Sequence, residues 1–320
     1  MRILLASTSQ DDLKFYKEIA ALAGMPLLQT SSFALLATEF QQDPNSIMVV
    51  ELATEQKYKE FEDTITKQIG LFNQILDTNK IFFVAPKELH EVSFLTKSDL
   101  FGHFIQRKYD EAVKQRLVCV FKLAASERAF DIAKYYTKEP KVQSLQVTKS
   151  SQKLAIVDSL KAYLAKIGFK SRVATGVATA VDELIMNAIF DAPVDEAGKV
   201  VHLNTPRSAN LDLTGRNIVD VKICFDGDTL GISVLDQHGS IDKKRLIDHI
   251  GRSYEDNEFK VKVTKAGAGL GLANVYRNCG GLVFVCEVGL KTEVILLYKK
   301  TDSFKEFKEQ PRFLSVFTYF

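Results

Sequence analysis

Short apolar runs alternate with amphipathic segments through the first hundred residues. Four runs have the continuous apolar character of buried parallel strands, the weakest being the second: Ile3–Ala6, Pro26–Leu28, Ile47–Leu52 and Ile81–Val84. Three segments between them have apolar residues at helical spacing: 11–24, 32–42 and 55–77. Strands that alternate with helices predict an α/β domain built on a doubly wound parallel sheet.

A long stretch without Gly or Pro follows, from His103 to Glu139. Its apolar positions fit one or two helices that close the first domain. The pattern breaks at Lys138–Lys141, which contains Pro140, so we expect the connection between domains there. The resulting division is a first domain over 1–125 and a helical linker over 126–145.

The second half of the chain has a different pattern. Two long helices are predicted first, one capped by Ser150 and Ser151 and one starting near Ser171 and ending before Pro193. A loop over 191–217 follows. Apolar alternation then predicts five antiparallel strands in 145–147, 219–225, 230–234, 282–288 and 294–298. We therefore expect an α+β two-layer sandwich over 146–300, followed by a tail over 301–320 with six aromatic residues, which either docks on the protein's own surface or binds a partner.

Composition narrows the function classes. The chain has 320 residues, 46% hydrophobic and 26% charged, with a formal net charge of +2. This balance gives no reason to expect nucleic acid or an anionic membrane as a partner. The four cysteines have neither CxxC nor zinc spacing, which is typical of buried thiols in a reducing compartment. No apolar run resembles a signal peptide or approaches the length of a membrane span, so we expect a cytoplasmic protein with no membrane association.

Three polar residues in the second half are candidates for chemistry. Glu183 and Asn187 lie four residues apart and therefore share a helix face. A carboxylate there could deprotonate a nucleophile, and an amide oxygen is a suitable ligand for Mg²⁺. Asp236 ends a strand, with Gly239 three residues later, and could accept a hydrogen bond from a nucleobase amino group. The alternatives are a solvated polar pair on a helix and an aspartate that forms a turn.

The string GAGLGL, residues 267–272, is more specific. Gly267, Gly269 and Gly271 alternate and lead into a helical run, an arrangement that brings backbone N–H groups to phosphates at a helix N-terminus. Leu272 stands where GxGxxG requires its third glycine, which disfavours a dinucleotide fold. No GxxxxGK[ST] phosphate loop is present.

Taken together, these motifs resemble the GHKL ATPase superfamily, in particular its compact version in anti-sigma-factor serine kinases. TAVDELIMNAIFDAP is similar to that superfamily's N-box, LDQHGSI to its aspartate box and GAGLGL to its glycine-rich box. Gly289 and Thr292 fall where the family's last Gly/Thr motif occurs. The resemblance implies that the chain binds ATP with Mg²⁺.

It also implies a role for each position. Glu183 would be the catalytic base and Asn187 the residue that holds Mg²⁺ on the phosphates. Asp236 would contact the adenine amino group, supported by Thr292. The remaining nucleotide-binding positions would be Gly239, Gly267, Gly269, Leu270 and Gly271. One departure is His238, which stands where the family has a glycine and could narrow the adenine pocket.

The first domain resembles a bacterial response-regulator receiver in length and element order, but without its chemistry. No acidic pair follows the first strand, because Asp11 and Asp12 come too late, and Glu51 stands in place of the phosphate-accepting aspartate. Lys97 could stand for the receiver's lysine. We interpret 1–125 as a pseudo-receiver that serves as an interaction domain.

Three functions remain open. The favoured one is a signalling kinase that acts in trans on a partner protein, with Ser/Thr favoured over His, because His90 and His103 lack the surroundings of a phosphoacceptor histidine. The second is a nucleotide-gated regulator that sequesters a partner, as anti-sigma factors do, without chemistry. The third is a scaffold with an inactive pocket. A homodimer through the helices of 104–137 is also conceivable.

Overall fold

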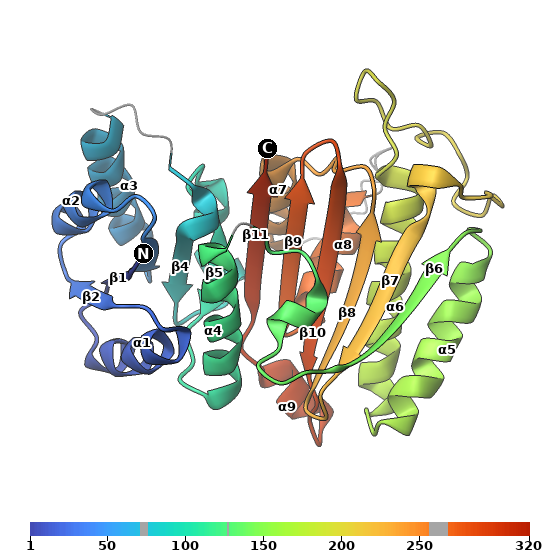
Figure 1. The fold of residues 1–320 in the computed structure, drawn as a ribbon, viewed down its shortest axis with the longest axis horizontal. Coiled ribbons are helices and arrows are strands. Elements are labelled where there is room, and N and C mark those ends of the chain that lie inside the picture. The colour runs from blue at the N-terminus through green and yellow to red at the C-terminus, as the bar shows by residue number, and fades with distance from the viewer. Residues whose placement is uncertain (71–75, 127, 256–267) are drawn as a thin grey trace. The chain divides into compact units, whose positions relative to one another are not determined.

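A computed structural model describes residues 1–70, 76–126, 128–255 and 268–320 (Figure 1). The chain forms two compact units. Unit 1 comprises Met1–Ala129 with Lys134–Thr137, and unit 2 comprises Phe130–Ala133 with Lys138–Phe320.

Unit 1 contains a parallel sheet with strand order β2-β1-β3-β4-β5. Its strands are β1 (Ile3–Ala6), β2 (Leu27–Thr30), β3 (Ile47–Glu51), β4 (Ile81–Ala85) and β5 (His103–Gln106). Its helices are α1 (Gln10–Ala23), α2 (Phe33–Gln42), α3 (Glu55–Gly70) and α4 (Glu111–Ala125), with short 3₁₀ segments η1 (Thr78–Lys80) and η2 (Leu89–Lys97). This is the flavodoxin-like strand order, so the doubly wound α/β prediction is confirmed.

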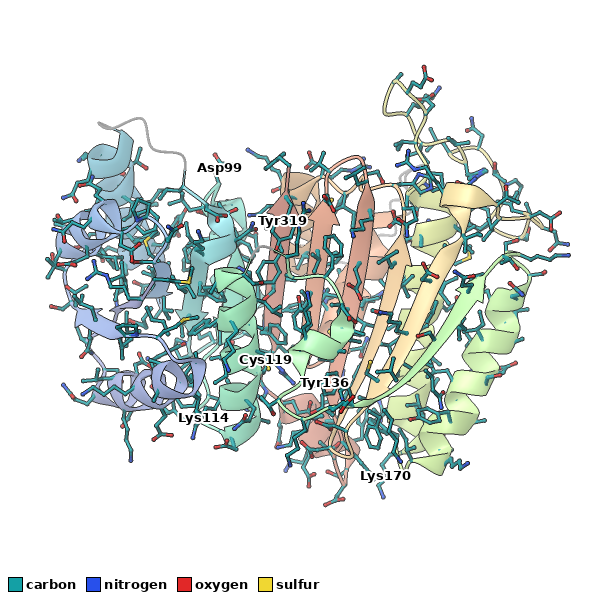
Figure 2. The ribbon with its side chains drawn as sticks, in the orientation of Figure 1. Asp99, Lys114, Cys119, Tyr136, Lys170 and Tyr319 are labelled. Carbon is teal, nitrogen blue, oxygen red and sulfur yellow. The ribbon has the colours of Figure 1, made fainter. Side chains whose placement is uncertain are left out.

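Local sequence explains most of these bounds. The strands β1, β3 and β4 are buried along their whole length, as their apolar runs predict. The Ser9 side chain caps α1 by accepting a hydrogen bond from the backbone N–H of Asp12, and Gly24 ends the helix with φ +72°. The four cysteines are buried, including Cys119 on α4 (Figure 2).

The helical prediction from His103 onward is wrong for its first four residues. His103–Gln106 form β5, parallel to β4, and the helix begins only at Glu111. A short apolar run such as Phe104–Ile105 does not distinguish a buried strand from a helix turn. The pairing with β4 decides it. Glycine at 102, just before the strand, lets the backbone pass close to Thr78, whose carbonyl a Cβ there would overlap.

Unit 2 contains a sheet with strand order β11-β9-β10-β8-β7-β6. Its strands are β6 (Lys141–Val147), β7 (Val219–Phe225), β8 (Thr229–Asp236), β9 (Gly281–Glu287), β10 (Lys291–Lys299) and β11 (Phe313–Tyr319). The pairs β6–β7, β7–β8, β8–β10 and β10–β9 are antiparallel, as predicted. The strand β11 pairs with β9 in parallel. Its helices are α5 (Gln152–Lys166), α6 (Ser171–Met186), α7 (Lys243–Glu255), α8 (Ala268–Arg277) and α9 (Phe304–Glu309).

The layers of unit 2 agree with a two-layer sandwich. Helices α6 and α8 lie behind the sheet in Figure 1 and contact β8 and β9, respectively. The aromatic segment 301–320 docks on this unit, because Phe313 and Phe317 of β11 are buried. A Cβ on Gly281 would overlap the Phe313 ring, so the two strands approach closely.

One helix in the described part of the chain, Ser171–Asp191, is long and apolar enough to cross a membrane by length and composition. Of its apolar window, 67% is buried inside the protein. A core helix of a globular unit passes the same test, and the apolar stripe through Val177 and Val181 packs into the core of unit 2.

Candidate functional site

The site residues on α6 belong to one continuous helical face. Glu183 lies in the last turn of α6, and Asn187–Asp191 continue the helix as one π-helical turn. The backbone N–H of Ala192 donates to the carbonyl of Asn187 at 2.9 Å, which closes the wider turn. π-Turns within helices are frequent at functional sites. This one adds Asp191 to the face that already carries Glu183 and Asn187.

Three side chains on this face and one loop arginine form a chain of polar contacts. With its amide nitrogen facing the two carboxylates, Asn187 donates to Glu183 Oε1 at 3.3 Å and to Asp191 Oδ2 at 2.9 Å. Asp191 Oδ2 also accepts from Nη2 of Arg207 at 2.7 Å. The helix therefore presents carboxylate, amide and carboxylate in a row, and a loop arginine neutralises the last of them.

Burial raises the pKa of both carboxyl groups, and for each of them Arg207 is the largest opposing influence. Asp191 adds to the rise for Glu183, whereas the hydrogen bond from Asn187 lowers it. A carboxylate whose pKa lies above its ordinary value is a better proton acceptor at neutral pH than a solvated one. The environment of Glu183 thus suits a general base.

The glycine-rich string approaches this face from α8. A Cβ on Gly271 would overlap the Glu183 carboxyl group, so the Glu183 side chain lies directly against the backbone of α8. Gly269 and Leu270 belong to the first turn of the same helix. Gly267 lies outside the described residues. With glycine at 271, the carboxyl group meets the helix start in its present position, whereas a larger residue would require the Glu183 side chain to move.

The strand-end aspartate has the burial of a recognition group. Asp236 ends β8, is 6% exposed and accepts a hydrogen bond from the backbone N–H of His238 at 2.9 Å. Burial raises its pKa to about 6, against the lowering effect of the backbone N–H groups of His238 and Gly239. Its carboxyl group is therefore a buried acceptor held at the end of a rigid strand.

Two neighbouring strands place side chains beside Asp236. Thr292 of β10 lies directly opposite Asp236, and Cys286 of β9 lies opposite Thr292. Residues opposite one another in antiparallel strands have side chains on the same face of the sheet. The Thr292 hydroxyl, fully buried, donates to Cys286 Sγ at 3.8 Å.

The turn after Asp236 is held by contacts that the sequence did not indicate. Gly239 has φ +60°, and a Cβ there would overlap the carbonyl of Glu287. Arg216 donates from Nε to the carbonyl of Gln237 at 3.0 Å and from Nη2 to the carbonyl of Gly289 at 2.9 Å. Arg216 thus connects the turns that follow β8 and β9. In the sequence, the only sign of this role is a positive charge within the predicted loop over 191–217.

His238, the departure from the family's glycine, is a buried neutral side chain. It is 8% exposed, and burial lowers its pKa, with Arg216 and His202 adding to the effect. Its Nε2 has no hydrogen-bond partner within the described part of the protein. Buried polar atoms are ordinarily hydrogen-bonded, so this nitrogen, two residues after Asp236, is available to a polar ligand.

The helix and strand parts of the site lie at the same end of unit 2. Ser240 Oγ, in the loop after β8, donates to the carbonyl of Ala192 at 2.8 Å. That carbonyl ends the π-turn that carries Asp191. The π-turn also contacts β8 directly. The structure therefore gathers Glu183, Asn187, Gly271, Asp236 and Thr292 around the adjoining ends of α6, α8, β8 and β10.

A metal ion would not find a cage of protein ligands here. In the described ranges, no group of three or more His, Cys, Asp or Glu side chains is placed to hold an ion. Mg²⁺ ordinarily uses one or two protein oxygens together with substrate phosphates and water. A single amide ligand at Asn187 is compatible with that mode.

The reverse face of β10 anchors the segment that precedes β6. Glu293 is 2% exposed and its Oε2 accepts the backbone N–H of Asp131 at 2.7 Å. Asp131, with φ +85°, accepts from Nζ of Lys222 at 3.2 Å. The ring of Phe130 lies 6.2 Å from that of Tyr319, which ends β11 (Figure 2).

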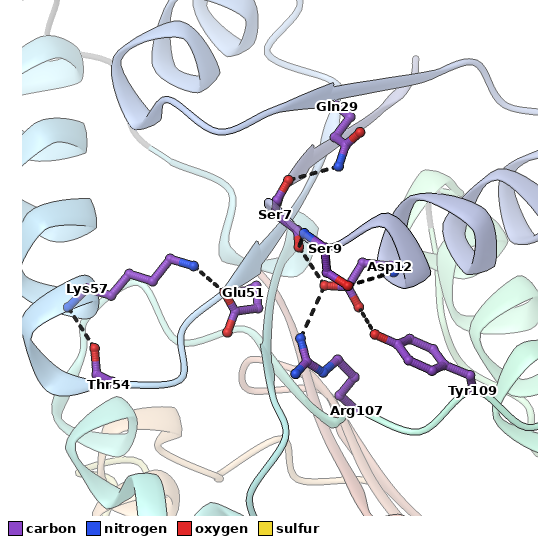
Figure 3. Close-up of polar contacts among 9 residues, drawn as sticks. All are labelled: Ser7, Ser9, Asp12, Gln29, Glu51, Thr54, Lys57, Arg107 and Tyr109. Atoms are coloured by element: carbon purple, nitrogen blue, oxygen red, sulfur yellow. Dashed lines mark hydrogen bonds and ion pairs between the residues drawn. The ribbon is translucent and has the colours of Figure 1, made fainter.

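In unit 1, the acidic side chains that follow β1 and end β3 are paired with basic side chains of the same unit (Figure 3). Asp12 is fully buried and accepts from Ser7 Oγ at 2.5 Å, Tyr109 Oη at 2.7 Å and Arg107 Nη1 at 3.4 Å. Glu51 forms an ion pair with Lys57. The interpretation as a pseudo-receiver is compatible with these pairs, which leave each acid with a cation of its own.

Other candidates in unit 1 have structural surroundings. Lys97 lies at the end of η2, whereas the cation that follows β5 is Arg107. His103 is fully buried, stacks on Phe82 with ring centres 4.0 Å apart and contacts the carbonyl of Asn79 through Nε2 at 2.8 Å. It is a core histidine. His90 lies 3.3 Å from the carboxylate of Glu88.

Comparisons with known proteins add little to this geometry. No family model matches the chain, and no curated protein matches it. Among solved structures, the chain is similar to one chain of the SiaB–SiaC complex from Pseudomonas aeruginosa, with 18% sequence identity and a TM-score of 0.33. The similarity covers 48% of this chain and 88% of that chain. A likeness at this level carries no argument about function.

Proposed function

We propose that unit 2 binds ATP with Mg²⁺ and transfers a phosphoryl group to a hydroxyl side chain of a partner protein. The observation that supports this most is the convergence of Glu183, Asn187 and Gly271, which the polar contacts and the close approach of α8 bring to one place. Phosphoryl transfer depends mainly on positioning and on neutralisation of charge. The proposed site offers a base, an oxygen ligand and a helix N-terminus.

Each residue has a defined task in this proposal. Asp236 accepts a hydrogen bond from the amino group of adenine, because its carboxylate is buried at a strand end. Asn187 holds Mg²⁺ against the phosphates, and Mg²⁺ supplies charge neutralisation when bound. Glu183 removes the proton from the attacking hydroxyl. The first turn of α8, including Gly269, Leu270 and Gly271, receives the phosphates on its N–H groups.

Ser or Thr is the proposed acceptor rather than a histidine of this chain. His103 is part of the core of unit 1, and His90 lies beside Glu88 on a 3₁₀ segment. In this proposal a protein partner brings the acceptor. The four buried cysteine thiols support a cytoplasmic location for this reaction. The homodimer through 104–137 stays a prediction.

A titration of the full-length protein tests the nucleotide site. MgATP is titrated calorimetrically into the wild type, Asp236→Ala and Asp226→Asn. The last is a control, because Asp226 lies in the β7–β8 turn, where its carboxylate accepts only local backbone N–H groups. We expect saturable binding that Asp236→Ala abolishes and the control keeps. A folded wild type that does not bind MgATP excludes the proposal.

A regulator without chemistry is the second candidate, and two observations favour it. His238 replaces the family's glycine beside Asp236, and the acids of unit 1 are paired with their own cations. In that case MgATP binds and changes affinity for a partner, while hydrolysis and transfer stay at the level of Glu183→Gln. Turnover above that level, measured with labelled ATP, excludes it.

A further inference from the structure

The loop that follows α6 places one arginine against the polar row of the site. Arg207 donates from Nη2 to Asp191 Oδ2 at 2.7 Å, the same oxygen that receives the Asn187 amide at 2.9 Å. The two side chains of the ion pair remain 36% and 31% exposed. Arg207 is therefore held by its contact with Asp191 and remains partly exposed to solvent beside the polar row.

The direction in which Arg207 acts follows from its neighbours. It is the strongest opposing charge for Glu183 as well as for Asp191, so its positive field reaches the proposed base. Arg245 of α7 also lowers the pKa of Asp191. Of these two cations, Arg207 is the one in contact with the polar row.

A guanidinium so placed has a further use. It has five N–H donors in a rigid fork, and the described contact with Asp191 uses one nitrogen. The geometry of such a fork matches a phosphate group, and Arg–phosphate pairs are stronger than neutral hydrogen bonds. The carboxylate of Asp191 can hold the arginine at the site until a phosphate competes for it.

We propose that Arg207 is the phosphate-binding cation of the site and that it contacts the terminal phosphate of ATP. The proposal rests on the nucleotide function given above. Glu183, as base, has to lie beside the group that attacks the terminal phosphorus, and Arg207 is linked to Glu183 through the contacts of Asp191 and Asn187. Arg207 thus stabilises charge at the reacting phosphate, while Asp191 positions the arginine before the nucleotide arrives.

The test compares affinities for MgATP and MgADP in the full-length protein, because only MgATP has the terminal phosphate. Arg207→Gln is the main variant, and Lys199→Gln removes a charge from an exposed position of the same loop. We expect Arg207→Gln to weaken MgATP binding roughly ten- to hundredfold, with a much smaller effect on MgADP. Lys199→Gln should leave the ratio of the two affinities unchanged.

Asp191→Asn separates direct binding from simple anchoring of the loop. If Arg207 only anchors the loop, breaking the ion pair from either side lowers the ATP-to-ADP affinity ratio equally. Under the proposal, Asp191→Asn lowers that ratio much less than Arg207→Gln does, because the guanidinium remains although its positioning carboxylate is lost. Arg207→Lys keeps the charge without the fork and should give an intermediate ratio.

The outcomes distinguish this inference from the function on which it rests. A wild type without MgATP binding removes the nucleotide site itself. A wild type that binds MgATP, with an unchanged ATP-to-ADP ratio in Arg207→Gln, overturns the role of Arg207 alone. Equal losses in Arg207→Gln and Asp191→Asn overturn it as well. Thermal unfolding of each variant verifies that the compared proteins are folded.

Discussion

The carboxyl group of Glu183 occupies the space that a side chain at position 271 would need. This relationship joins the polar face of α6 to the start of α8, two elements separated by more than eighty residues of sequence. Glycine at 271 thus makes room for a side chain of another helix, besides any room that a nucleotide would need. A change at this contact should therefore affect both the stability of unit 2 and the chemistry of the proposed site.

Gly271→Ala should therefore destabilise unit 2 by roughly 1–3 kcal/mol, since the added Cβ forces the two helices or the carboxyl group to move. An ordinary Gly→Ala change in a helix has the opposite sign, about 0.5–1 kcal/mol of stabilisation. Gly176 of α6 is the matched control, because open space surrounds its Cβ position. Urea unfolding of Gly271→Ala, Gly176→Ala and the double variant Gly271→Ala/Glu183→Ala measures the difference. The overlap predicts recovery in the double variant.

Asp236→Asn should stabilise the folded protein at pH 7.5 while it impairs nucleotide binding. The pKa of Asp236 is raised to about 6, so the folded protein holds the proton more tightly than the unfolded chain does. Stability then falls as pH rises from about 4 through about 6, by roughly 2–3 kcal/mol in all. The neutral amide of Asn at 236 does not titrate, so the variant does not lose this stability as the pH rises.

The measurement for Asp236→Asn is the difference in unfolding free energy from the wild type at pH 4.5 and pH 7.5. The advantage of the variant should be small at the lower pH and larger at the higher one. A variant that is less stable than the wild type at pH 7.5 contradicts this explanation of the pKa.

Glu183→Gln and Asn187→Asp should separate catalysis from metal-dependent binding. Gln at 183 keeps an acceptor for the Asn187 amide, so binding of MgATP is largely retained while turnover falls by roughly 10²–10⁴. Asp at 187 places a third carboxylate between Glu183 and Asp191 and repels the phosphates. Calorimetry with and without Mg²⁺ compares the two, and equal losses of binding would argue against separate roles.

The pH dependence of turnover should reflect Glu183. Burial raises the pKa of Glu183 above its ordinary value of 4.5, and a base acts only in its deprotonated form. Activity should thus increase with pH through a limb that lies above pH 4.5. Arg207→Gln removes the largest opposing charge and should move this limb to higher pH. A limb that does not shift would mean that another group limits the rate.

Asp131→Gly should be less destabilising than Asp131→Ala, by roughly 1 kcal/mol. Both changes remove the carboxylate that accepts from Lys222, but alanine keeps a Cβ in a left-handed conformation with φ +85°. Urea unfolding of the two variants gives the difference. Equal stabilities would show that this backbone conformation carries little strain.

Much of the fold could be read from local patterns. The runs at Ile3–Ala6 and Ile47–Leu52 and the hairpin around Asp226 and Gly227 became β1, β3 and β7–β8 within a residue or two. In each case the hydrophobic period or the turn chemistry is sufficient by itself. The alternation of elements then determined the parallel sheet of unit 1.

Other elements depend on partners far away in the sequence. His103–Gln106 is too short to be distinguished from a helix turn, and strand pairing, including that with β4, makes it a strand. Phe313–Tyr319 has a strand's aromatic content, but its place beside β9 is set by a parallel pairing that no local signal specifies. Long-range pairing decides these cases.

The candidate site divides in the same way. The spacing of Glu183 and Asn187 and the alternating glycines are sequence features, so these residues were identified. The contributions of Asp191, Arg207 and Arg216 arise from a π-turn and from loop arginines that fold back on it. A charged residue in a loop has no preferred partner until the loop is folded.

Thr292 and Glu293 are adjacent on β10 and face opposite sides of the sheet, the first toward Asp236 and the second toward Asp131. A slip of the β9–β10 pairing by a single position would exchange them. It would bring a second buried carboxylate beside Asp236 and take away the acceptor of the Asp131 N–H group. The turn over 288–290 therefore cannot gain or lose one residue without damage on both sides of the sheet at once.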